Sequence, residues 1–181
     1  MPRTPGYPLL SLFLAFALST GVHAQSAPSD LSDPEVAHVA VTANSIDIDL
    51  AKLAQSRTHN RDVKQFAATM ITDHSAVNAQ ASALATKLGV TPKDNAVSQS
   101  LLKGATEARA TIEPLKGKVF DQAYIDREVG YHQAVLDALD NLLIPTSENA
   151  ELKKLLVDVR PAIAAHLEHA KQLQSTLVAS K

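Results

Sequence analysis

Apolar residues recur every three to four positions along most of this chain, which is the spacing of amphipathic helices. Asp33-Pro34-Glu35 supplies a cap, a proline and an acid at a first helix start, and Gly89 followed by Pro92 ends a second helix. No segment alternates with the period of two that a half-buried strand requires. The pattern therefore predicts an all-α fold. The expected helices cover 33–57, 60–88, 95–112, 118–144 and a final span capped at Ser147-Glu148 that contains Pro161 and reaches Ala179.

Four of these helices are long, at roughly 36 to 48 Å, as in the members of a bundle. Short connections join the first long helix to the second and the third to the fourth, so each pair should form an antiparallel hairpin. The roughly 28 residues between the hairpins are enough for an extra helix that returns along the bundle. We expect a ferritin-like four-helix bundle of two hairpins with a long crossover. A plain up-down-up-down bundle is the alternative.

The first residues have the pattern of a secretory signal peptide. Arg3 precedes an apolar run over 9–18, and Val22-His23-Ala24 places small residues before a cleavage point. We assign 1–24 to a signal peptide, 25–33 to a flexible leader and 34–179 to the bundle domain. The prediction is an exported protein, periplasmic or associated with the outer membrane, with no transmembrane helix after cleavage.

Each long helix places one ionisable residue at the centre of its apolar face. At 100° per residue, the apolar positions of each helix gather within about 40° of one polar residue. These residues are Asp47, His74, His132 and His166. Asp49, by contrast, points about 160° away from Asp47. All four lie near the midpoints of their helices, so aligned antiparallel helices should bring them into one layer.

Buried ionisable groups must pair, bind a ligand or reach water. Three imidazoles and one carboxylate suit a single divalent transition metal, either Zn(II), Fe(II), Ni(II), Co(II) or Cu(II). We expect three further residues one helical turn away to surround the four ligands: Glu128, Asn78 and Met70. Glu128 and Asn78 would fix the orientation of the rings. A neutral hydrogen-bonded network without metal is the other hypothesis, and the sequence leaves both open.

Composition removes several classes of function. The net charge of −2, with 4% aromatic residues and no Trp, provides neither the charge nor the stacking surfaces that nucleic-acid binding needs. The absence of Cys excludes disulfides, thiolate metal sites and cysteine nucleophiles. Ile71, Val129 and Ile163 stand three residues before His74, His132 and His166, so none of these histidines completes the Glu-x-x-His motif of a di-iron oxidase. No catalytic residue or organic cofactor site is indicated. An enzyme is not favoured, and nothing points to a particular protein partner or oligomeric state.

Several segments resemble the motifs of the bacterial domain-of-unknown-function 4142 family. They are 46–54, Met70-Ile71-Thr72-Asp73-His74, Phe120-Asp121-Gln122-Ala123-Tyr124 with His132, and 161–167. The resemblance covers about residues 34–178 and implies an exported, ferritin-like bundle of the kind often named as a membrane or outer-membrane protein. It implies no established activity. Members usually carry Glu where this chain has Asp47. Asp73 matches the family's Asp-His motif but lies about 100° from His74 on the helix, so it should contact a neighbouring helix.

Overall fold

The computed structural model describes residues 31–179, and this part of the chain is helical with no strand. The predicted signal peptide and most of the predicted leader lie outside the described residues. The elements are α1 (Asp33–Arg57), α2 (Arg61–Leu88), α3 (Ala96–Ile112), α4 (Gly117–Ala138), the π-helical segment η1 (Leu139–Leu143), α5 (Ile144–Thr146) and α6 (Ala150–Ala179). The predicted all-α class is confirmed.

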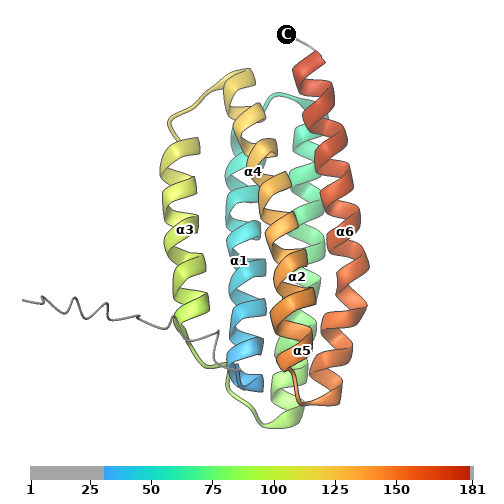
Figure 1. Cartoon of the computed structure of the whole chain (residues 1–181). Helices are drawn as coiled ribbons and strands as arrows, with labels where there is room; N and C mark the ends of the chain where they lie inside the picture. The colour runs from blue at the N-terminus through green and yellow to red at the C-terminus, as the bar shows by residue number, and fades with distance from the viewer. Residues whose placement is uncertain (1–30, 180–181) are drawn as a thin grey trace, which may run out of the picture.

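The long helices form two antiparallel hairpins, α1 with α2 and α4 with α6. α2 also packs against α6, and α1 against α4, which closes the four-helix bundle. In Figure 1, α3 returns along the outside of the bundle from the lower end to the upper end, so α2 and α4 run in the same direction. α3 packs against α1 and α4. This is the predicted crossover arrangement, and the up-down-up-down alternative is wrong.

α1 begins one residue earlier than its predicted cap implies. Ser32 is the cap, and its N–H and hydroxyl both donate to the Glu35 carboxylate, at 3.0 and 2.6 Å. Asp33 is the first helical residue. Leu31, just before the cap, is buried in the core. Residues 31–33, expected in the leader, therefore belong to the packed domain in this structure.

The start of α6 is capped by Asn149 and not by the predicted Ser147. The Oδ1 atom of Asn149 accepts the N–H groups of Glu151 and Leu152 at 2.9 and 3.1 Å, which satisfies donors at the helix start. The hydroxyl of Ser147 instead donates to a main-chain carbonyl at the end of η1. The Asp33 carboxylate accepts the N–H groups of residues 148 and 149. This contact ties the start of α1 to the turn between α4 and α6.

The helical path of α4 continues past the expected stop at Pro145. In η1 the N–H of Ile144 donates to the carbonyl of Leu139, five residues earlier. Proline in an α-helix lacks a donor and its ring meets a carbonyl four residues earlier. The wider π turn relieves that conflict, so the chain stays helical through Thr146. Pro161 likewise lies inside an uninterrupted α6.

The core has two halves of different composition. At the end where α1 finishes, the aromatic end, Phe66, Phe120, Tyr124 and Met70 are fully or almost fully buried. At the other end, the aliphatic end, the buried residues are Leu, Val and Ile. Between the two halves lies a layer of polar side chains. Among residues 31–179, no helix combines the length and hydropathy needed to cross a membrane.

Candidate metal centre

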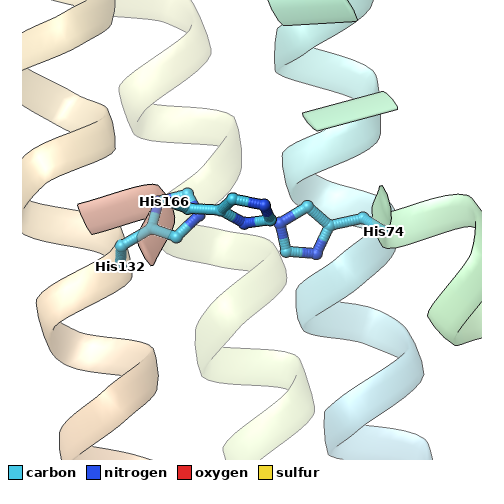
Figure 2. A group of neighbouring side chains, drawn as sticks. All are labelled: His74, His132 and His166. Carbon is cyan, nitrogen blue, oxygen red and sulfur yellow. The ribbon is translucent and has the colours of Figure 1, made fainter. Parts of the chain in front are cut away.

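The four predicted residues meet in the middle of the bundle, one from each long helix. Asp47 lies on α1, His74 on α2, His132 on α4 and His166 on α6, with exposed fractions of 0, 4, 1 and 7%. The ring centroids of the histidines are 5.4 to 5.7 Å apart. Figure 2 shows the three rings side by side in one layer across the bundle. The structure thus assembles the carboxylate and three imidazoles that the sequence pattern predicted.

The potential ligand atoms lie close together. One nitrogen from each of the three rings lies within 4.8 Å of the others. The Oδ2 atom of Asp47 is 3.1 Å from Nε2 of His74 and 3.4 Å from Nε2 of His132. Neither approach has the geometry of a hydrogen bond, since all three atoms are buried without a hydrogen-bond partner.

Two rings are oriented by oxygen atoms on the side away from Asp47. Nδ1 of His74 is 2.7 Å from Oδ1 of Asn44, and Nδ1 of His132 is 3.0 Å from the main-chain oxygen of Glu128. These oxygens are acceptors, so in each ring Nδ1 carries the hydrogen and donates it. The Nε2 atom of each neutral ring is then left with a lone pair that faces Asp47.

The third ring is held in the opposite tautomer. Nε2 of His166 is 2.9 Å from Oδ2 of Asp73 on α2, so Nε2 donates and Nδ1 carries the lone pair. This Nδ1 atom is also buried without a hydrogen-bond partner. The contact also satisfies the expectation that Asp73 reaches a neighbouring helix.

Metal-binding histidines in proteins usually donate their second ring N–H to a carboxylate or carbonyl oxygen, which fixes the tautomer and the ring direction. All three rings of this layer show that pattern. Three lone pairs and a carboxylate oxygen directed into one buried layer repel one another unless a cation or protons lie between them. The arrangement can therefore hold a metal ion.

A second acidic group lies beside the centre but carries its own counter-charge. Asp47, Glu128 and His132 also offer ligand atoms within 4.8 Å of one another. Nη1 of Arg127, however, is 2.7 Å from Oε1 of Glu128 and 3.9 Å from Oδ1 of Asp47, and its guanidinium lies 3.7 Å above the Tyr131 ring. This single guanidinium already supplies positive charge to the group, which favours a buried ion-pair network here over a second cation site.

Burial and neighbouring charges shift the pKa values of several groups in the layer. Burial acts to raise the pKa of Asp47, but its contact with His74 and the charges of His132 and Arg127 outweigh burial and hold that pKa at about 2. Burial lowers the pKa of His132 to about 4, and it also lowers the pKa of His166. A lowered pKa favours the neutral form of His132 and His166, which keeps the lone pair that ligation needs.

Glu128 behaves differently from Asp47. Burial, followed by the charge of Asp47, raises the pKa of Glu128 well above its ordinary value, and Arg127 opposes the rise. Its Oε2 atom lies 3.4 Å from Nδ1 of His132. Glu128 therefore contacts a candidate ligand, as the sequence predicted, while its charge is balanced by Arg127.

Two of the predicted surrounding residues have other contacts. Asn78 donates to Oγ of Ser45 at 3.2 Å and holds neither ring, and Met70 is buried in the core of the aromatic end. Sequence reasoning missed Asn44 and Arg127. Asn44 lies one turn before Asp47 on the same face of α1, and that spacing could have identified it as a partner of a neighbouring ligand.

Comparisons with known proteins agree with the fold. The chain matches the family described as Domain of unknown function (DUF4142) over residues 17–173, which confirms the resemblance seen in its motifs. No curated protein matches it in sequence. A similar solved structure is described as "CopM in the Cu(II)-bound form". It has a TM-score of 0.61 and 15% identity, and the match covers 81% of this chain and 98% of that one, which shows a shared fold.

Proposed function

Since this chain belongs to the DUF4142 family, whose name carries no activity, we propose its function from the chemistry of its own centre. The protein is an exported bacterial envelope protein that binds one divalent transition metal ion inside its helical bundle. The ligands are Asp47, His74, His132 and His166. Its role is to store or buffer the ion.

One observation carries this proposal. Each of the three buried rings uses one nitrogen to donate to an oxygen, and each leaves its other nitrogen without a partner. A structural hydrogen-bond network would be expected to satisfy those nitrogens, because an unsatisfied buried polar atom costs about 1–3 kcal/mol. A bound cation satisfies all three at once.

The donor set fits the proposed ions. Three imidazole nitrogens and a carboxylate oxygen suit Zn(II), Fe(II), Ni(II), Co(II) and Cu(II). Ligand atoms around a tetrahedral ion lie about 3.4 Å apart, so ring nitrogens within 4.8 Å of one another need only modest side-chain rotation to close on one. CopM, which shares this fold, is described as Cu(II)-bound, and Cu(II) is therefore the first ion to test.

Equilibrium dialysis followed by elemental analysis tests the proposal. The purified protein is dialysed separately against each of the five ions, alongside His74→Ala and the control His59→Ala, whose histidine is exposed. We expect one ion per chain for the wild type and for His59→Ala, with stoichiometric binding lost in His74→Ala. The proposal fails if the wild type binds none of the ions stoichiometrically, or if His74→Ala binds as well as the wild type.

A structural or stress-related envelope protein without metal is the second candidate. The close pair of Arg127 with Glu128 favours it, because the guanidinium supplies positive charge to this buried carboxyl group without a metal ion. On this hypothesis His132→Leu keeps or raises the stability of the fold, and added metals leave the melting temperature of the wild type unchanged. The metal hypothesis predicts the opposite, since an ion that binds only the folded state raises the melting temperature.

Export is tested separately. The proposed signal peptide predicts a mature chain that begins at Gln25 and fractionates with the periplasm or the outer membrane. Mass spectrometry of the protein from each cell fraction gives both the mature N-terminus and the location. An N-terminus at Met1 in the cytoplasmic fraction alone would contradict export.

A further inference from the structure

The aliphatic end of the bundle is incompletely packed along α2. No side chain of α2 is buried after His74, although its apolar stripe continues for three more turns. A cavity of about 100 Å³ runs beside this stripe and is lined by residues from α1, α2, the α4–η1 path and α6. The stripe residues that line it are Val77, Ala81, Leu84, Ala85 and Leu88.

The walls of this cavity are aliphatic between its two ends. Its polar lining residues are Asp33 and Asn149 at one end and Asn44 at the other, and the rest are Ala, Val, Leu and Ile. Asp33 and Asn44 lie on one helix, eleven residues or roughly 16 Å apart, so the cavity is elongated along the bundle.

The side-chain oxygen atoms at both ends already accept hydrogen bonds or lie against a donor. Both carboxylate oxygens of Asp33 accept main-chain N–H groups, and Oδ1 of Asn44 accepts from His74. Water in a cavity needs two to four polar partners, and the aliphatic walls offer none. Apolar cavities of roughly 150 Å³ in other proteins stay dry and bind small apolar molecules such as benzene.

A route into the cavity lies along the seam between α2 and α6. Leu84 and Leu155 line both the cavity and a shallow depression on the outer surface of this seam. Both are only half-buried, so these two side chains separate the cavity from solvent. The exposed ion pair of Lys87 with Glu151 joins the two helices beside them. Rotation of two leucine side chains is a small motion that would admit a narrow molecule.

We propose that this cavity binds a short, unbranched, uncharged aliphatic molecule. The elongated aliphatic walls select a linear chain, and they offer no polar partner to a charged group in the interior. The cavity contains none of the four proposed metal ligands, so this inference stands independently of metal binding.

Binding of 1-hexanol, followed by the methyl resonances of the full protein in NMR titrations, tests the proposal. We expect saturable shifts at the methyl groups of Val77, Leu84 and Leu155 and none in the aromatic end. Sodium hexanoate, which has the same chain length, should bind at least about tenfold more weakly because its carboxylate would lose hydration without gaining a partner.

Two matched variants locate the site. Ala81→Leu adds three carbons to the cavity and should weaken 1-hexanol binding by at least about tenfold. Ala83→Leu adds the same carbons to the exposed face of α2 and should leave 1-hexanol binding unchanged. Ala85→Leu fills the same space from the next turn and replaces Ala81→Leu if circular dichroism shows that the latter fails to fold. The proposal is overturned if the wild type shows no saturable shifts, if hexanoate binds as well as hexanol, or if a folded cavity-filling variant binds like the wild type.

Discussion

Nε2 of His74 lies 3.1 Å from Oδ2 of Asp47, with both side chains buried and no hydrogen bond between them. Because Nδ1 of His74 already donates to Asn44, Nε2 presents a lone pair to an ionised carboxylate. Two electron-rich atoms at this distance in a buried layer repel each other. A metal ion bound by His74 and Asp47 would remove this repulsion.

Replacing the carboxylate should weaken metal binding without changing the shape of the layer. Asp47→Asn keeps the size of the side chain but removes the charge that attracts a divalent ion, and we expect a loss of affinity of about 10- to 100-fold. Asp49→Asn is the control, because Asp49 lies two residues further along α1 and is exposed. Competition with a chelator of known affinity measures both. Equal affinities for the two variants would remove Asp47 from the ligand set.

Asn44, which contacts His74, should affect metal affinity more than Asn78, which the sequence pattern placed beside the ring. Asn44→Leu removes the acceptor for Nδ1 and releases the ring, so metal affinity should fall about 10- to 100-fold. Asn78→Leu removes only a hydrogen bond to Ser45 and should leave the affinity nearly unchanged. The same chelator competition compares them. The reverse order of effects would show that the tautomer of His74 is not set by Asn44.

Removing the buried guanidinium should destabilise the fold strongly. Arg127→Met leaves the Glu128 and Asp47 carboxyl groups without their counter-charge, and we expect the free energy of unfolding to fall by about 3–5 kcal/mol. Arg109→Met removes an exposed pair with Glu113 and should cost less than about 1 kcal/mol. Urea unfolding at pH 7 measures both. The double variant Arg127→Met/Glu128→Gln should recover part of the loss, and a loss no larger than that of Arg109→Met would contradict the network.

The metal-free protein should lose stability as the pH falls from 7 to 4. The pKa of His132 is about 4 in the folded protein against 6.5 ordinarily, so between these values the unfolded chain binds the proton first. This stabilising contribution is complete above pH 6.5 and is lost as the pH falls toward 4, which amounts to up to about 3 kcal/mol. The lowered pKa of His166 acts in the same direction.

Two carboxyl groups, Glu128 and Asp47, also change the pH dependence of stability, within and below this range. The raised pKa of Glu128 has the opposite sign, because its contribution is present at low pH and is lost as the pH rises above 4.5. The stabilising contribution from the lowered pKa of Asp47 is complete above pH 3.8 and is lost as the pH falls from 3.8 toward 2. The measurement is therefore the difference between wild type and His132→Leu in urea unfolding with a chelator present. The wild type should lose more stability than His132→Leu between pH 7 and 4, and parallel curves would rule out burial of a neutral His132.

Helical periodicity alone predicts the four residues at the centre of the site. Asp47, His74, His132 and His166 each interrupt an apolar stripe at mid-helix, and four mid-helix positions in an antiparallel bundle share one height whichever way each helix runs. That argument needs only the rise per residue and the short connections. It explains why the layer in Figure 2 could be predicted before any coordinates were known.

The partners of these residues could not be predicted in the same way. Asn44 and Asn78 both lie about one turn from a candidate ligand, and periodicity alone does not distinguish which of them bonds to His74. The choice depends on how α1 is rotated about its axis relative to α2. A rotation of a few tens of degrees decides whether His74 bonds to Asn78 on its own helix or to Asn44 on α1. Arg127 was missed for a similar reason, since its guanidinium reaches Glu128 and Asp47 along a long, flexible side chain.

The sequence by itself determined the helices, the crossover between hairpins and the level at which polar groups enter the core, because these follow from local periodicity and chain length. Only the tertiary structure decided the tautomer of each histidine, the neutralisation of Glu128 by Arg127, the π turn before Pro145 and the cavity beside α2. Those features depend on how the side chains of separate helices pack together. Contacts between residues far apart in the chain produce no periodic pattern in the sequence.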